Sequence, residues 1–233
     1  MIKLIQLKQV VTNKRFLLFT LFIPITWYIL LYNLQGGLSP NIMLGIAVFI
    51  GIIGNSLGTF SKRISSNINF YAFEAKFTKY SLKSYLVDQS IVQIVLNELI
   101  FISILCVASI FFHFAITANL VIQFFLLTMM GIYFSIIGFV LGVRLDSMLL
   151  DTISFPVIIL AAMTIVPFSL FNTGSGIVNL ISKIQMIFPG YYYTNIISDL
   201  YSGRVINMAD LCLFVLVFIL NIIPLYLLIN KKR

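Results

Sequence analysis

Long unbroken apolar runs, separated by short polar stretches, dominate the pattern of residues along the chain. Six of these runs approach or exceed the roughly 18 to 20 residues that a helix needs to cross the hydrocarbon core of a bilayer. Because apolar and polar residues do not alternate within the runs, the pattern predicts helices rather than strands. We expect six spans, at about residues 16–34, 42–60, 90–114, 120–143, 148–171 and 210–230.

The segment at residues 66–86, between the second and third spans, is polar and aromatic in a chain that is otherwise apolar. At helical spacing its residues fall into one apolar face and one neighbouring basic face. Three roles fit such a helix: lying in the headgroup layer, packing on the protein's own helix ends, or docking into a groove of a cytoplasmic partner. The apolar face carries Phe70, Phe73, Phe77 and Tyr80, and the basic face carries Lys76, Lys79 and Lys83.

A second unusual segment, residues 172–206, precedes the last span. It is too long for a simple turn and too apolar for a solvated loop. Phe188-Pro189-Gly190 divides it into two short predicted helices, residues 177–187 and 191–201, and Gly203 supplies a stop for the second helix. We expect both helices to lie in, or dip into, the outer leaflet. At the other end of the chain, residues 1–15 predict a weakly amphipathic interfacial helix.

Composition agrees with a single transmembrane domain over residues 1–233. Hydrophobic residues make up 61% of the chain and charged residues 9%, and the mean hydropathy is +1.08. An ordinary soluble domain is about one quarter charged. Since backbone groups in lipid cannot be satisfied by water, helices that satisfy their own hydrogen bonds are the expected elements. The fold class predicted is therefore an all-α integral membrane protein.

Basic residues are distributed unequally between the two ends of the predicted spans. The tails and the even-numbered loops hold 13 of the 15 Lys and Arg residues, and only Lys183 and Arg204 fall on the other side. Basic residues favour the cytoplasmic side of short loops, so both termini are predicted to be cytoplasmic. The formal charge of +8 is then explained by topology, and no nucleic-acid partner is expected.

Catalytic and metal-binding motifs are scarce. The chain has one histidine, His113, and its two cysteines, Cys106 and Cys212, lack metal-ligand spacing. The Gly-Ser-Gly at residues 174–176 has no convincing base partner for a serine nucleophile. No phosphate-binding loop occurs, because no glycine precedes a lysine. We therefore expect neither a catalytic residue nor a metal site, and any ATP hydrolysis must come from another chain.

Polar and small residues inside the spans give the remaining candidates. Gly54-x-x-x-Gly58, with Asn55 and Ser56 between, permits close helix approach, either at a pathway or dimer face or within one chain. Pro156 favours a bend in the fifth span, either a static kink or a gating joint. Glu98 is the one acid well inside a span, and it fits either a binding site for a cationic substrate or a hydrogen-bonded structural role.

Two segments also carry a family resemblance. FPGYYYTNIISDLYSG, before the last span, has a proline, then tyrosines and, one helix later, a glycine. Residues 66–86 contain Glu74, Tyr80-Ser81-Leu82 and Tyr85-Leu86, without the proline and the Arg-Glu-x-Gly-Thr core usual at this place. The two segments and the layout of the whole chain resemble the ABC-2 type permeases, the membrane subunits of a class of ATP-binding-cassette exporters.

The resemblance implies partners and roles. Permeases of this family pair as homodimers or heterodimers on two ATPase subunits, so an ATPase, a second copy or paralogue, and membrane lipid are the implied partners. ATP and Mg would be bound by the ATPase, and no cofactor by this chain. A coupling helix within residues 66–86 would dock on the ATPase through Phe73, Glu74, Lys76, Phe77, Lys79 and Tyr80. Substrate would pass between protomers along spans two and five, near Gly54, Asn55, Gly58, Phe155 and Pro156.

The function expected is therefore export of a hydrophobic or amphipathic substrate, such as a peptide, drug or lipid, across a bacterial plasma membrane. The alternative is a stand-alone transporter or immunity-type membrane protein without an ATPase partner. That class normally needs more buried ionisable groups than one glutamate.

Overall fold

The computed structural model describes residues 12, 17–34, 39–77, 82–166 and 176–230. Helices form nearly all of this described part, and no strand occurs in it. Four of its helices are long and apolar enough to cross a membrane: Pro40–Ile68, Val87–Phe112, Asn119–Arg144 and Met208–Leu225. Two more apolar helices, Thr20–Leu34 and Ser147–Met163, are shorter. The described chain thus has the character of a multi-helix membrane protein.

The first two helices of the described chain pack antiparallel to each other at one side of the bundle. A π-helical turn, η1 (Leu17–Phe22), leads into α3 (Ile23–Leu34), and α4 (Pro40–Ile53) follows with Pro40 in its first turn. Proline suits this position because the first turn needs no backbone donor. Most of the predicted interfacial segment, residues 1–15, lies outside the described residues.

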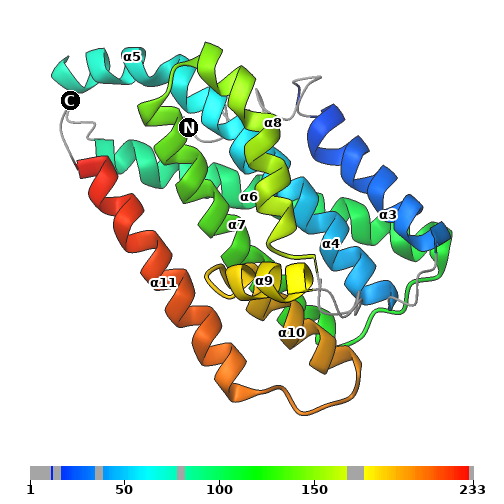
Figure 1. Ribbon diagram of the computed structural model, residues 1–233. Coiled ribbons are helices and arrows are strands. Elements are labelled where there is room, and N and C mark those ends of the chain that lie inside the picture. Colours follow the sequence, from blue (N-terminus) through cyan, green and yellow to red (C-terminus); the bar gives the residue numbers. More distant parts are fainter. Residues whose placement is uncertain (1–11, 13–16, 35–38, 78–81, 167–175, 231–233) are drawn as a thin grey trace.

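Helix α4 does not end where its apolar run ends. It continues through a π-helical segment, η2 (Gly54–Phe60), into α5 (Ser61–Phe77), whose outer part leaves the bundle (Figure 1). The sequence predicts a span at 42–60 followed by a separate segment at 66–86. In the structure the helix is continuous from Pro40 to Phe77, because no glycine or proline after Gly58 interrupts it.

Three further helices form most of the rest of the bundle. They are α6 (Leu82–Phe112), α7 (Asn119–Arg144) and α8 (Ser147–Met163). Helix α8 begins at a side-chain cap, because the Leu149 amide donates to Asp146 Oδ1 at 3.0 Å. Pro156 lies inside α8. The fifth predicted span, 148–171, extends beyond this helix, and its residues 167–171 lie outside the described residues.

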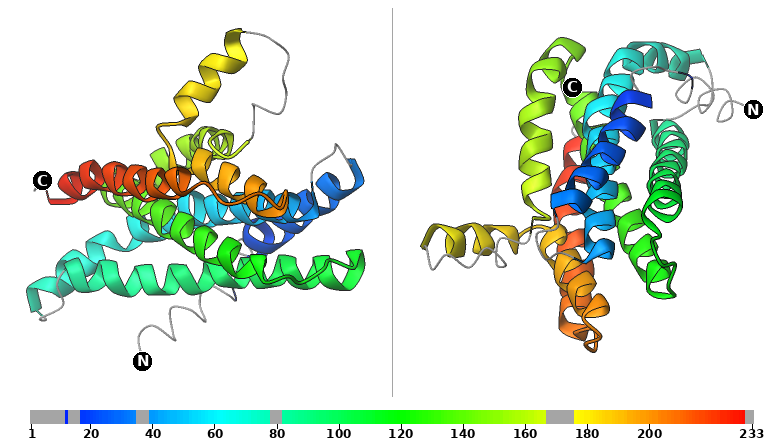
Figure 2. Two further views of the ribbon diagram at one scale, coloured as in Figure 1. Left: turned by 90° about the horizontal axis from the view of Figure 1, so that it is seen from below. Right: turned by 90° about the vertical axis from the view of Figure 1, so that its right-hand side faces the viewer.

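Two short helices and one long helix close the fold. They are α9 (Gly176–Gln185), α10 (Pro189–Tyr201) and α11 (Met208–Asn230). Helix α9 stands away from the bundle at a steep angle, whereas α10 packs beside α11 (Figure 2). Gly203, with φ +70°, lets the Arg204 amide reach the Asp199 carbonyl at 3.1 Å and terminate α10.

The two ends of the bundle are formed by different helices and held by different polar contacts. The outer end of α5, the start of α6, the α7–α8 turn and the end of α11 lie at one end (Figures 1 and 2). There an ion pair joins Lys62 of α5 to Asp151 of α8, and Ser65 Oγ donates to the Leu145 carbonyl at 2.8 Å. Helices α9 and α10 belong to the opposite end, where Asn119 Nδ2 donates to the Leu200 carbonyl at 3.3 Å.

Candidate functional site: a buried amide cluster

Five polar side chains meet inside the bundle, where apolar residues surround them. We call them the amide cluster: Asn55 and Ser56 of η2, Gln93 and Asn97 of α6, and Ser135 of α7. All five are buried, and in lipid no water outside the bundle can replace their partners. Polar residues placed so deep in a membrane-type bundle are expensive and are therefore candidates for function.

Hydrogen bonds connect the amide cluster across three helices. Asn55 Nδ2 donates to Asn97 Oδ1 at 3.1 Å, and Gln93 Nε2 lies 3.4 Å from both Asn97 Oδ1 and Ser56 Oγ. The hydroxyls of Ser56 and Ser135 lie 3.4 Å apart. Asn97 Oδ1 therefore accepts from two amides at once, and η2 is tied to both α6 and α7.

Arg63 contacts the amide cluster from the end of the bundle that carries Lys62. Arg63 Nη2 lies 3.3 Å from Gln93 Oε1, and the Arg63 guanidinium carbon lies 5.1 Å from the centre of the Phe60 ring. A cation above an aromatic face is stabilised by the ring quadrupole. The arrangement forms a polar line from Asn97, deep in the bundle, to a positive charge nearer its end.

Glycines of α7 allow this helix to pack closely against η2, α5 and α6. A Cβ added to Gly138 would overlap the Ser56 carbonyl oxygen, and one added to Gly142 would overlap the Ser61 carbonyl oxygen. At Gly131 an added Cβ would lie 2.6 Å from Asn97 Nδ2. Close approach through small residues is the usual way in which membrane helices pack.

Part of the cluster's hydrogen-bonding capacity is unused among the described residues. Asn97 Nδ2 and the nearby buried Gln89 Oε1 have no hydrogen-bond partner there. The five members of the cluster carry neutral amides and hydroxyls, so the cluster cannot store or relay protons by titration. What it can do is accept a water molecule or a polar group of a ligand, or rearrange its hydrogen bonds when η2 moves.

A second polar group lies at the opposite end and involves Gln123 of α7. Gln123 Nε2 donates to the Asn41 carbonyl at 3.0 Å, and the Tyr201 hydroxyl donates to Gln123 Oε1 at 2.8 Å. Burial raises the pKa of Tyr201 to about 12, and burial also raises the pKa of Tyr193. Both phenols thus stay protonated, and the group fastens α10 to the ends of α4 and α7.

Glu98 belongs to neither group. Its side chain is half-buried, and Thr128 Oγ1 of α7 donates to Glu98 Oε1 at 2.7 Å. This geometry fits the structural, hydrogen-bonded alternative. Glu98 follows Asn97 in the chain but takes its hydrogen bond from Thr128 rather than from the amide cluster.

The predicted pathway residues separate into buried and exposed members. Asn55 is buried within the chain, and a Cβ on Gly58 would meet Ile158 of α8 at 3.6 Å, so both pack inside one protomer. Gly54 begins η2, next to Asn55. Phe155 and Pro156 lie on the exposed side of α8, whereas Gly54 and Gly58 are half-buried.

The predicted coupling residues are only partly described. Phe73 lies on the outer part of α5 and is 64% exposed. The backbone of Glu74, Lys76 and Phe77 belongs to the same helix, but their side chains lie outside the described part of the structure. Lys79 and Tyr80 lie outside the described residues altogether.

Comparison with known proteins adds no identity, because no protein-family model, curated protein or solved structure matches the chain. The described residues also contain no group of three His, Cys, Asp or Glu side chains that could hold a metal ion. Sequence reasoning singled out Asn55 and Ser56 but missed Gln93 and Ser135. Their signal was present, since each is a polar residue within an otherwise apolar run.

Proposed function

We propose that this chain is the membrane subunit of an ATP-driven exporter of the ABC-2 type. It would move a hydrophobic or amphipathic substrate, such as a peptide, drug or lipid, with ATP hydrolysed on a separate subunit. The chain has no phosphate-binding loop of its own. The proposal places it in the plasma membrane of a bacterium, with both termini cytoplasmic and with a second copy or paralogue as partner.

One observation carries the proposal: helix α5 continues out of the bundle and exposes an aromatic residue there. Its extension and the start of α6 lie at the same end of the bundle (Figure 1), and we call these two helix ends the elbow. Phe73 lies on the outer part of α5, and Lys76, Lys79 and Lys83 follow it in the sequence. An exposed aromatic residue among basic residues is suited to a groove of a protein partner.

The amide cluster supports a coupling between that elbow and the interior. Helix α5 is continuous with η2, and η2 carries Asn55 and Ser56. A movement of the elbow would therefore be transmitted to the amide cluster through one continuous helix. Within the proposal, Phe155 and Pro156 on α8 are the surface through which a second protomer or the substrate is contacted.

Co-purification with an ATPase tests the proposal. The tagged chain would be co-expressed with the products of its neighbouring genes, purified in detergent and assayed for vanadate-sensitive ATP hydrolysis. We expect a stable complex that Lys76→Glu with Lys79→Glu weakens, whereas the matched double reversal Lys231→Glu with Lys232→Glu leaves it intact. A chain that purifies alone and without ATPase activity in several detergents would instead support a stand-alone transporter or immunity-type protein.

A further inference from the structure

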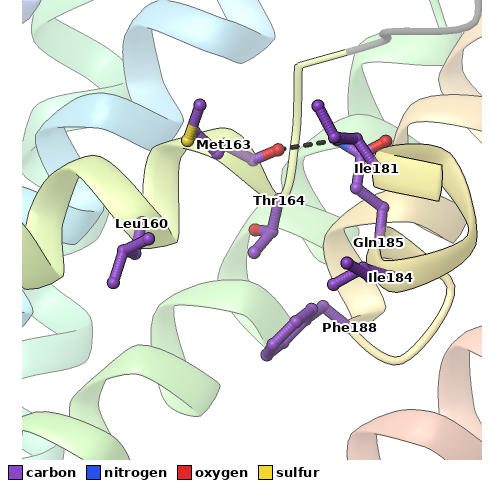
Figure 3. Close-up of a pocket in the computed structure, with 7 residues that line it drawn as sticks. All are labelled: Leu160, Met163, Thr164, Ile181, Ile184, Gln185 and Phe188. Carbon is purple, nitrogen blue, oxygen red and sulfur yellow. Dashed lines mark hydrogen bonds between the residues drawn. The ribbon is translucent and has the colours of Figure 1, made fainter. Parts of the chain in front are cut away.

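An apolar pocket of about 330 Å³ lies between the end of α8 and α9 (Figure 3). Leu160, Met163 and Thr164 line it from the α8 side, and Ile181, Ile184 and Phe188 line it from the other side. The volume falls near the lower end of the roughly 300–1,000 Å³ typical of ligand sites in proteins. Its walls come from two helices that meet at a steep angle, so it is a cleft with one side open.

Polar atoms around the pocket are already engaged. Gln185 Nε2 donates to the Met163 carbonyl at 2.6 Å and to the Val166 carbonyl at 2.8 Å, and so uses both of its hydrogens (Figure 3). Thr164 Oγ1 donates to the Ala161 carbonyl at 2.7 Å. The surface that remains for an occupant is therefore hydrocarbon, which favours an alkyl chain over a polar or charged group.

The mouth of the pocket opens onto exposed apolar surface. Leu160 is exposed, and Ile159 and Met163 on the same helix are exposed as well. Exposed apolar helix surface of this kind is solvated by acyl chains in a membrane. A lipid chain can therefore enter the pocket sideways from the bilayer.

Helix α9 adds a charge at the position that a headgroup would need. Lys183 is exposed, and it lies two residues from both Ile181 and Gln185, hence on the opposite side of the helix from the pocket. A helix with an apolar face and a lysine on the other face lies at a membrane interface, with the lysine among the phosphates. Helix α9 therefore presents the pocket on one side and the Lys183 ammonium on the other.

We propose that this pocket binds one acyl chain of a phospholipid from the leaflet in which α9 lies, and that Lys183 favours an anionic headgroup. The lipid would fill the angle between α8 and α9 and support the position of α9. The inference concerns a resident lipid rather than a transported substrate, and it does not depend on an ATPase partner.

Photo-crosslinking in nanodiscs tests it. The full chain would be reconstituted with phosphatidylglycerol that carries a diazirine near the end of one acyl chain, and the labelled peptides would be identified by mass spectrometry. We expect label concentrated at residues 160–164 and 181–188. Ile184→Trp fills the pocket, and the matched control Ile219→Trp places the same change on α11, where the isoleucine is 51% exposed against 50% for Ile184.

Each methylene kept out of an apolar site weakens binding roughly fourfold, so Ile184→Trp should lower labelling of the pocket peptides at least about fourfold. Ile219→Trp should leave it unchanged. Leu160→Trp repeats the test from the other wall. Label spread evenly over all lipid-facing helices, or pocket labelling that survives both Ile184→Trp and Leu160→Trp, would overturn the proposal.

The headgroup is tested separately with Lys183→Glu. Labelling by the phosphatidylglycerol probe should fall, whereas labelling by a phosphatidylcholine probe with the same diazirine chain should stay. Equal labelling by both probes in the unaltered chain would overturn the role of Lys183. Since no nucleotide or ATPase is present, a negative result here leaves the proposed function unaffected.

Discussion

Asn97 holds two other buried amides in place, because its Oδ1 accepts from Asn55 and from Gln93. Replacing it by leucine would keep the side chain's approximate size and leave both donors without that acceptor. We expect Asn97→Leu to lower the free energy of unfolding by about 1–3 kcal/mol. Unfolding in a fixed detergent measures the change.

Ser103→Ala is the matched control on the same helix, since the half-buried Ser103 donates its hydroxyl to the Leu99 carbonyl of its own helix. That variant should stay within about 0.5 kcal/mol of the unaltered chain. Equal stability of Asn97→Leu and Ser103→Ala would show that the amide cluster does not hold α6 and η2 together.

Gly138 is one of the two positions on α7 where an added Cβ would overlap the backbone of a neighbouring helix. An added Cβ would overlap the Ser56 carbonyl oxygen, and backbone cannot move aside as a flexible side chain can. We expect Gly138→Ala to destabilise the protein by about 1–3 kcal/mol despite the better helix propensity of alanine. At Gly176 an added Cβ meets nothing within 4 Å, so Gly176→Ala should be neutral or stabilising. Unfolding in a fixed detergent measures both variants.

The sequence indicates such residues without showing their partners. The glycines at 138 and 142 predict close approach, and Asn97 and Glu98 stand out in an apolar run. That Asn97 meets Asn55 while Glu98 meets Thr128 depends on the rotation of α6 against η2 on one side and α7 on the other. Hydropathy along one chain carries no information about that rotation.

Among the helices, α9 is joined to the bundle by Gln185. Its side chain donates to the Met163 carbonyl at the end of α8 and to the Val166 carbonyl just beyond that helix. Gln185→Leu should loosen α9 and raise the hydrogen-exchange rate of its amides about tenfold, which corresponds to losing one or two net hydrogen bonds. Ser182→Ala, on the same helix, should leave the rates unchanged, and equal rates in all three proteins would contradict the assigned role.

Helix ends were predictable where local chemistry sets them. Phe188-Pro189-Gly190 separates α9 from α10, and Gly203 follows the end of α10, because proline starts a helix and glycine adopts positive φ. The continuation of α4 into α5 through η2 was not predictable. A π-helical turn leaves no signature in the hydrophobic pattern, and packing against α7 and α8 decides whether it forms.

For the whole molecule, the unequal distribution of basic residues predicts which end faces the cytoplasm. In a chain with both cysteines, Cys106 and Cys212, replaced by alanine, we expect Ser202→Cys to react with a membrane-impermeant maleimide in intact cells. Ser66→Cys, which is also exposed, should react only after the membrane is permeabilised. The reverse pattern would invert the topology and remove the elbow of α5 and α6 from the cytoplasm.

Cross-linking from the elbow tests the central claim most directly. Phe73 would be replaced by the photoreactive p-benzoylphenylalanine in cells that express the chain with its neighbouring genes. Phe125 of α7, which is 62% exposed against 64% for Phe73, provides the matched control position. The account predicts an ATP-hydrolysing subunit cross-linked from position 73 and none from position 125. Cross-links from position 73 to lipid alone, with an ATPase produced in the same cells, would contradict it.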